Sequence, residues 1–326
     1  MQKNSYPTFE DKYNTQLWPR IQRWARNAVK DSLFNATGKP GKLIRLIEEG
    51  AIQPFAPCEN KRSIWHSSAA RWDLWNRSID FETQALDYRV MSPGEHWHTK
   101  THLSIDALDS LIAREHATKH TFDIKEIKGL AASKSSDYPF DSISQFAVER
   151  CQKYIGDGLA PRLDRNMEWG EIHLDRMSFC HFSWAKQHTP FWMNSGGSHH
   201  FAAAHYVASR QGLNFKLEGR LTKYSVSTLS ALSLNSQWAM FLLDDVSIFT
   251  TFMDAMSDFR CDFGVSEVPR QLFSNETFYP DDSSSSRCVK VVFLKRDDKK
   301  ARATAQVLTD AGFASFNPYI EKLAEG

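Results

Sequence analysis

The sequence predicts an α/β (mixed α+β) protein, in which a mixed sheet with helices follows a helical, Trp-rich N-terminal part. Three observations lead to this prediction. The first third carries apolar residues at helical spacing, and the C-terminal half alternates short apolar or β-branched runs with helical segments. Hydrophobic residues make up 41% of 326, which is enough to bury one large core or two moderate ones.

The N-terminal part is expected to begin with an amphipathic helix over residues 16–34. Its apolar positions recur near the helical period at Leu17, Ile21, Trp24, Ala28 and Leu33. Its cations lie on the other faces: Arg20, Arg23, Arg26 and Lys30. A short second helix begins at Leu43 and ends at Gly50, because glycine commonly follows a helix C-terminus.

The next elements are a strand within residues 80–91, a turn at Pro93-Gly94 and a helix with Ser104 as its N-cap. A small, polar segment then runs from Gly129 to Pro139. We place a soft domain boundary there. It separates a helical, aromatic-rich region over residues 1–130 from an α/β region over residues 140–326.

The C-terminal region is expected to alternate between strands and helices. Helices are predicted over residues 143–155, 198–211, 246–259 and 297–311. Strands are predicted over residues 190–194, 215–221, 237–243 and 288–294.

Bulk composition excludes some classes of protein. Lys and Arg together number 40 against 39 Asp and Glu, which argues against a chain built mainly to coat nucleic acid or an anionic membrane. No run approaches 18 apolar residues, and the five cysteines lack disulfide or zinc spacing. We expect a soluble, cytoplasmic protein with reduced thiols and no membrane partner.

One turn combines several features of an anion site. Asn194 and Ser195 precede Gly196 and Gly197, and a helix follows from Ser198, His199 and His200. Glycines allow a ligand to approach the backbone closely, and the first amides of a helix attract phosphate. Ser198 adds a hydroxyl or a helix cap, and the two imidazoles add N–H donors. A plain strand-turn-helix with a serine cap is the alternative.

The segment around Gly196 to Ala203, about a dozen residues in all, resembles the nucleotide-binding box of the ParB/sulfiredoxin superfamily. Sulfiredoxins read Gly-Gly-Cys-His-Arg-Tyr there, and family members include CTP-binding partition proteins, an ATP-using sulfinic acid reductase and a free-serine kinase. Ser198 stands at the catalytic cysteine of sulfiredoxin, so sulfinic acid reduction is not supported. His200 stands where the family usually has arginine, so phosphate binding would be weaker and would depend on pH.

The resemblance implies a nucleoside triphosphate with Mg as the ligand. Ser195, Gly196, Gly197 and Ser198 would bind phosphate, while His199, His200 and Ser198 would act in phosphoryl transfer or hydrolysis. Glu168 and Glu171 are candidates to orient magnesium or to activate a hydroxyl. Whether the chain is an enzyme is left open, as are its phosphoryl acceptor and its oligomeric state.

Two other patterns carry alternatives. His96, His98 and His102 have a spacing that allows zinc, but no further ligand is placed beside them, so no metal site is assigned. The Trp residues at 65, 72, 75 and 97 are expected to pack in the core, with a stacking platform as the alternative.

The competing function is a non-enzymatic accessory protein of a bacterium or phage. Its basic N-terminal helices would contact nucleic acid or a protein partner. Nucleic-acid binding should weaken steeply with salt, whereas nucleotide binding in a pocket should respond less and should need magnesium.

Overall fold

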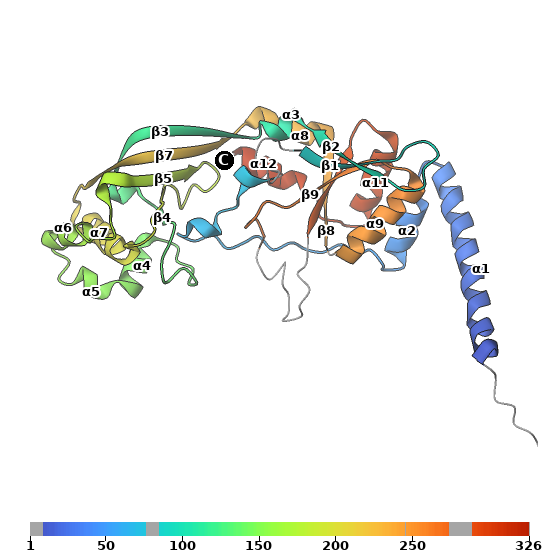
Figure 1. Ribbon diagram of the computed structural model, residues 1–326, viewed down its shortest axis with the longest axis horizontal. Coiled ribbons are helices and arrows are strands. Elements are labelled where there is room, and N and C mark those ends of the chain that lie inside the picture. Colours follow the sequence, from blue (N-terminus) through green and yellow to red (C-terminus); the bar gives the residue numbers. More distant parts are fainter. Residues whose placement is uncertain (1–8, 76–84, 245, 274–288, 326) are drawn as a thin grey trace, which may run out of the picture.

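The computed structural model describes residues 9–75, 85–244, 246–273 and 289–325. Two five-stranded sheets lie end to end in an elongated molecule (Figure 1), with strand orders β2-β1-β9-β10-β8 and β3-β7-β5-β6-β4. Helices cover both sheets, and this arrangement confirms the mixed α/β class. No helix of the described residues is long and apolar enough to cross a membrane.

The first sheet is antiparallel at every pairing. Its strands are β1 (Ala85–Val90), β2 (Thr99–Ser104), β8 (Trp238–Leu243), β9 (Phe263–Glu267) and β10 (Lys290–Lys295). Every residue of β8 is buried, which explains its uninterrupted apolar sequence. The helices on this sheet are α2 (Gly41–Glu48), α9 (Val246–Phe259) and α11 (Lys299–Asp310). The long helix α1 (Phe9–Ala36) contacts α2 near its own C-terminus.

The second sheet is mixed, because β5 runs parallel to β7 and β4 runs parallel to β6. Its strands are β3 (Ile112–Asp123), β4 (Gly129–Leu130), β5 (Met177–Phe182), β6 (Phe191–Trp192) and β7 (Lys216–Val226). The helices packed beside it are α4 (Ile143–Arg150), α5 (Gln152–Ile155), α6 (Ala160–Met167) and α7 (Ser198–Gln211). The 3-10 helices of the chain span His66–Ser68, Trp72–Leu74, Ile124–Glu126 and Leu174–Arg176.

Helix α7 is the central helix of this second half. Phe201 and the three alanines at 202–204 are fully buried, and the Phe201 ring lies 4.6 Å from that of Trp192 on β6. Small side chains let a helix approach its neighbours closely. The position of the α7 N-terminus is therefore fixed by packing over its first two turns.

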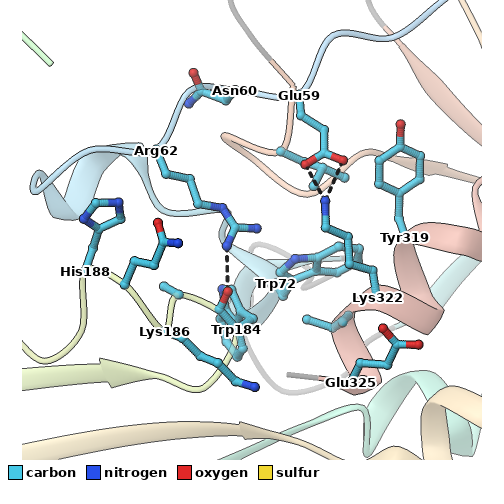
Figure 2. A pocket seen from close by; sticks show the side chains of 14 residues that line it. Glu59, Asn60, Arg62, Trp72, Trp184, Lys186, His188, Tyr319, Lys322 and Glu325 are labelled. Carbon is cyan, nitrogen blue, oxygen red and sulfur yellow. Dashed lines mark hydrogen bonds and ion pairs between the residues drawn. The ribbon is translucent and has the colours of Figure 1, made fainter. Parts of the chain in front are cut away.

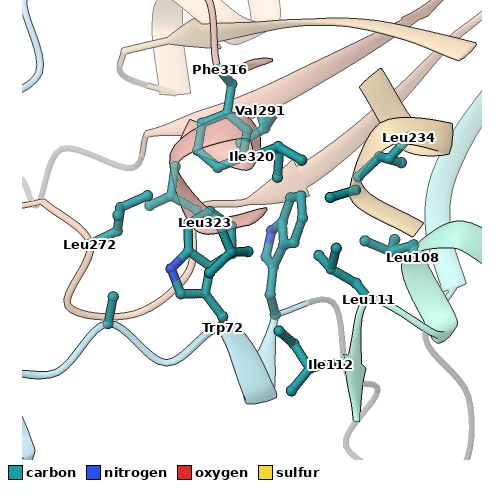
Figure 3. Packing of buried hydrophobic residues seen from close by; sticks show 14 of the residues in the cluster. Trp72, Leu108, Leu111, Ile112, Leu234, Leu272, Val291, Phe316, Ile320 and Leu323 are labelled. Atoms are coloured by element: carbon teal, nitrogen blue, oxygen red, sulfur yellow. The ribbon is translucent and has the colours of Figure 1, made fainter. Parts of the chain in front are cut away.

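A third core lies between the half of the molecule built on the first sheet and the half built on the second sheet (Figure 3). Trp72 and Trp75 pack edge to face there, and they meet side chains from α3 (Asp106–Asp109), α8 (Thr228–Gln237), β10 and α12 (Asn317–Glu325). Trp65 is also buried, whereas Trp97 is 68% exposed. Core packing is thus confirmed for three of the four tryptophans, and Trp97 is the exception.

The predicted helices over 198–211 and 246–259 are confirmed to the residue. The predicted N-cap at Ser104 is wrong, because Ser104 pairs with Ala85 in β2 and the short helix α3 begins after Ile105. The soft boundary at 130–140 stays a prediction. Gly129 and Leu130 pair there with β6, and region 1–130 contains α1 and α2 together with β1, β2 and β3.

Candidate functional site

The Gly-Gly turn joins β6 to α7 in a geometry that only glycine tolerates easily. Gly197 is the N-cap of α7 and has φ +70°. A Cβ atom at this position would lie 2.8 Å from Cγ1 of Ile172. A larger residue at position 197 would therefore be destabilising, because of both the left-handed backbone and the close contact with Ile172.

The serine cap, one of the two alternatives for Ser198, is wrong, because Ser198 is the first helical residue and the N-cap of α7 is Gly197. The Ser198 side chain is buried, and its hydroxyl lies 3.5 Å from Nδ1 of His199. The first amides of a helix have no acceptors within the helix, and they carry the positive end of its dipole. This end of α7 therefore remains suited to an anion.

Asn194 fixes the turn to the segment after β4. Its side-chain oxygen accepts from the amides of Ala131 and Ala132, at 2.9 and 3.1 Å. Its side-chain nitrogen donates to the carbonyls of Ala132 and Gly196, at 2.7 and 3.0 Å. The buried amide thus holds two backbone segments at a fixed distance from each other.

A cavity of about 630 Å³ opens at this turn, and the turn forms one wall of it. Every residue predicted for the site lines the cavity: Ser195, Gly196, Gly197, Ser198, His199 and His200. Of the two candidate acids, Glu171 lines it and Glu168 does not. Oε2 of Glu171 accepts from the Gly197 amide at 2.7 Å, so a carboxylate already occupies one donor of the turn.

Three cations from other elements complete the cavity. Lys134 follows β4, Arg150 ends α4 and Lys153 lies on α5. None of the three forms an ion pair with a carboxylate of the described residues. The Arg150 guanidinium lies 4.3 Å from the ring of Tyr138, and the Lys153 ammonium lies 4.6 Å from that of Tyr154. The cavity therefore gathers three cations around a single carboxylate.

Both histidines of the turn have lowered pKa values. Burial is the main cause for each, and the neighbouring Lys153 lowers both further. Glu171 opposes the shift at His200. The imidazoles are therefore neutral at pH 7 without a ligand, and an anion would have to raise their pKa before they could bind it as cations.

The tautomer of His200 follows from its neighbour Asn166. The Asn166 side-chain nitrogen donates to the Tyr154 carbonyl at 3.0 Å, which directs the amide oxygen toward Nδ1 of His200, also at 3.0 Å. Because an amide oxygen only accepts, Nδ1 carries the proton and neutral Nε2 is an acceptor. The expectation that His200 offers an N–H donor to phosphate thus holds only for its protonated form.

Aromatic rings surround His200. The indole of Trp169 stacks on the imidazole, with centroids 4.2 Å apart and an angle of 8° between planes. The Tyr154 ring lies 4.1 Å from the imidazole centroid. Trp169 remains largely exposed, so part of its surface is available to a planar ligand group.

Sequence reasoning found the turn but missed the rest of the cavity wall. The missed residues are Lys134, Arg150, Lys153, Tyr154 and Trp169. Arg150, Lys153 and Tyr154 lie close together in the sequence, whereas Lys134 and Trp169 lie in loops outside that segment, and none belongs to a motif with recognisable spacing. The packing of α4 and α5 against α7, together with these two loops, brings them together.

The histidine pattern at His96, His98 and His102 does not form a metal site in the described part of the chain. Nδ1 of His98 lies 2.9 Å from the Ser257 hydroxyl, and Nε2 lies 2.8 Å from the Cys261 carbonyl. His102 lies 3.4 Å from the carboxylate of Asp87 on β1. These two side chains therefore have structural contacts on different elements.

A second cavity, of about 570 Å³, lies between the two halves of the molecule (Figure 2). Lys322 of α12 points to Glu59, with nitrogen-oxygen distances of 2.9 and 3.0 Å. Nη1 of Arg62 donates to the Trp184 carbonyl at 2.7 Å. Two of the cations that line this cavity, Lys322 and Arg62, thus already bind groups of the protein itself.

The comparisons with known proteins give a family and no function. No curated protein and no solved structure matches the chain. One family model, described as a family of unknown function (DUF6685), matches residues 117–326, which include the whole cavity at the turn. Because this match covers more than half of the sequence, the chain belongs to the DUF6685 family.

Proposed function

We propose that this protein binds the phosphate groups of a nucleotide in the cavity at the turn. The amides at the start of α7 would donate to phosphate oxygens, and Lys134, Arg150 and Lys153 would neutralise their charge. The exposed surface of Trp169 would contact the base. A cytoplasmic location, where nucleotides are abundant, is part of this proposal.

One observation carries the proposal: three cations without carboxylate partners among the described residues line the cavity at the start of α7, where Glu171 binds the Gly197 amide and no N-cap side chain bonds the helix. A hydrogen bond to a charged group contributes about 1.5–3 kcal/mol. The cations are exposed, so salt will reduce this contribution. The cavity is large enough for a nucleotide, because its volume of about 630 Å³ lies within the roughly 300–1,000 Å³ that ligand pockets commonly span.

Phosphoryl transfer or hydrolysis is a further step of the proposal. Nε2 of neutral His200 is an acceptor and suits a general base, while the buried Ser198 and the partly buried His199 would stabilise charge. Glu171 is the one carboxylate in the cavity lining. Magnesium would therefore be held mainly by the phosphates, as is usual for this ion.

Thermal unfolding with ATP, CTP, GTP and pyrophosphate, each with and without magnesium, tests binding. A ligand that binds only the folded state raises the midpoint. We expect a shift that disappears in a Lys134→Gln/Arg150→Gln/Lys153→Gln variant. A Lys186→Gln variant, which alters the second cavity, is the matched control and should keep the full shift.

A Ser198→Ala/His199→Ala/His200→Ala variant tests the turn itself. Loss of the shift there would assign the ligand to the start of α7. If no nucleotide shifts the midpoint of the parent protein, the proposal is wrong, and turnover assays would then have no basis.

The second candidate is nucleic-acid or protein binding without catalysis, through the basic N-terminal helices. Its supporting observation is the exposure of Arg20, Arg23 and Arg26 on α1. Duplex binding that falls steeply between low and moderate salt would favour this function. It would be insensitive to the substitutions at the turn.

A further inference from the structure

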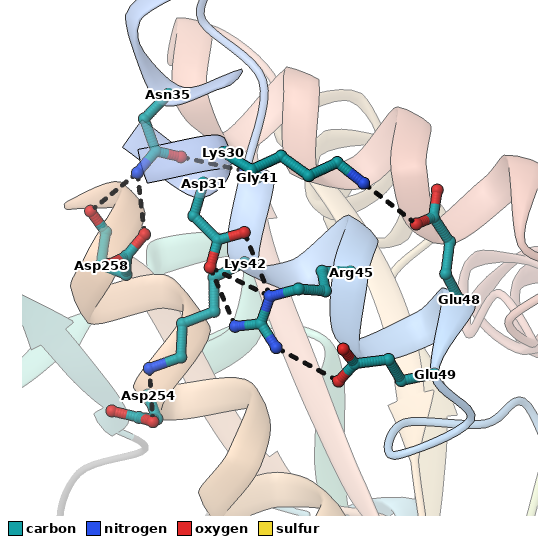
Figure 4. Close-up of polar contacts among 10 residues, drawn as sticks. All are labelled: Lys30, Asp31, Asn35, Gly41, Lys42, Arg45, Glu48, Glu49, Asp254 and Asp258. Carbon is teal, nitrogen blue, oxygen red and sulfur yellow. Dashed lines mark hydrogen bonds and ion pairs between the residues drawn. The ribbon is translucent and has the colours of Figure 1, made fainter. Parts of the chain in front are cut away.

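The C-terminal third of α1 is tied to the body of the protein (Figure 4). The buried carboxylate of Asp31 pairs with Arg45 of α2 at 2.9 Å. The Asn35 side chain donates to the Asp258 carboxylate at 2.8 Å and accepts from the Gly41 amide at 2.9 Å. These contacts fix the direction in which the rest of the helix extends.

The remainder of α1 projects away from both sheets (Figure 1). From Pro19 onward, where the structure describes the side chains of this helix, four large apolar ones are exposed: Ile21 at 45%, Trp24 at 72%, Val29 at 62% and Leu33 at 66%. An exposed group of this kind on one helix is typical of an interaction surface. We call these four residues the apolar arc.

The cations of α1 lie on the opposite half of the helix. At about 100° per residue, the apolar arc spans roughly one half of the circumference, and Arg20, Arg23, Arg26 and Lys30 span the other. No acidic residue occurs from Pro19 to Lys30. Lys30 has one weak ion pair, at 3.8 Å from Glu48, and the three arginines have none with described carboxylates.

We propose that α1 lies in the surface of an anionic lipid membrane. A helix with an apolar face that includes tryptophan and a polar face rich in arginine binds such surfaces in the plane of the interface. The apolar arc would enter the headgroup boundary, and the cations would meet the anionic headgroups. The balance of 40 cations and 39 anions over the whole chain conceals this local excess, which is why no membrane partner was expected from composition.

Two other partners fit the surface less well. A second copy of α1, packed against the apolar arc, would leave the arginines of both helices in water without an anionic partner. A nucleic acid would satisfy the arginines but would leave the apolar arc in water. An anionic bilayer satisfies both halves of the helix.

The test is co-flotation of the full chain with vesicles of phosphatidylcholine mixed with phosphatidylglycerol, compared with phosphatidylcholine alone. We expect binding to the anionic vesicles, and we expect it to weaken with salt. An Arg20→Gln/Arg23→Gln/Arg26→Gln variant should lose on the order of 100-fold in affinity, about fivefold for each cation. Trp24→Ser should lose about tenfold.

The matched control is Leu229→Ser, because Leu229 on α8 is 81% exposed and lies outside the apolar arc. It should bind as the parent does, and circular dichroism should show that all variants keep their helix content. No flotation with anionic vesicles overturns the proposal. Equal flotation with both vesicle types overturns it too, as does self-association that Trp24→Ser abolishes in the absence of any vesicle binding.

Discussion

The two cavities differ little in volume, about 630 Å³ at the turn and 570 Å³ between the halves, but they differ in how their charges are matched. Between the halves, Lys322 pairs with Glu59 and Arg62 donates to a carbonyl. At the turn, three cations have no described carboxylate partner, and the single carboxylate binds a backbone amide instead. Volume therefore does not distinguish the two cavities, whereas the matching of their charges does.

The comparison also distinguishes charges that are matched within the protein from charges that have no partner there. An ion pair between exposed side chains contributes little to folding, so the Glu59–Lys322 pair needs no ligand to explain it. Cations gathered around a helix N-terminus repel one another and are repelled by the positive end of the helix dipole. Such an arrangement is unfavourable for the protein alone and becomes favourable when an anion binds.

The largest expected effect comes from Gly197→Ala, which attacks the backbone of the turn. The left-handed φ and the contact with Ile172 together should cost about 2–4 kcal/mol of unfolding free energy. Gly158→Ala is the matched control, because Gly158 has φ +69° but no atom within 4 Å of an added Cβ, so it should cost only about 1–2 kcal/mol. Urea unfolding measures both, and equal costs would show that Ile172 moves aside freely.

The next effect concerns the carboxylate in the turn cavity. Glu171→Gln keeps an acceptor for the Gly197 amide but removes a negative charge from the site of the proposed anion. Affinity for pyrophosphate without magnesium should rise about tenfold, as expected for one charge removed from a solvated site. Titration calorimetry measures this affinity. A fall in the affinity for magnesium-ATP alone would instead assign Glu171 to the metal, and no change with either ligand would argue against binding at this turn.

A smaller effect concerns pH. Because the folded pKa values of His199 and His200 are lowered, the unfolded chain binds more protons, and the ligand-free protein should lose stability as pH falls through about 6.5. An anion raises both pKa values, so its affinity should increase over the same range, by about threefold to tenfold between pH 8 and pH 6. Thermal shifts with sulfate, which does not titrate here, measure the effect. A His199→Gln/His200→Gln variant should remove it, and a pH-independent affinity in the parent would exclude protonation of the histidines on binding.

The smallest effect is expected in the second cavity. Lys322→Gln removes an exposed ion pair and should change the free energy of unfolding by less than about 1 kcal/mol. It should leave pyrophosphate affinity unchanged. If this variant weakens pyrophosphate binding more than the triple substitution at Lys134, Arg150 and Lys153, the roles of the two cavities are reversed.

Local patterns predicted much of the fold. The helices at 198–211 and 246–259 follow from apolar periodicity, and the buried strand β8 follows from its continuous apolar run. Strand β3 was missed because most of its residues are polar and exposed, so no alternation appears in its sequence. Helix α8 was missed as well, since its serines and its two exposed leucines obscure the apolar face.

The residues of the candidate site also divide into those that the sequence pattern predicts and those that it does not. The turn is continuous in the sequence, so its glycines, serines and histidines could be predicted together. Lys134, Arg150 and Lys153 could not, because they meet only through the loop after β4 and the packing of α4 and α5 against α7. The tautomer of His200 also depends on Asn166 of α6, more than thirty residues away in sequence.

The four hydrogen bonds of Asn194 have a consequence for how this family can diverge. They hold the backbone at Ala131 and Ala132 against the turn, so the loop that follows begins from a fixed point. Ser133 and Lys134, which line the cavity, follow directly from this point. Insertions or deletions over residues 135–139 can then be accommodated while Asn194 still holds the start of the loop beside the turn.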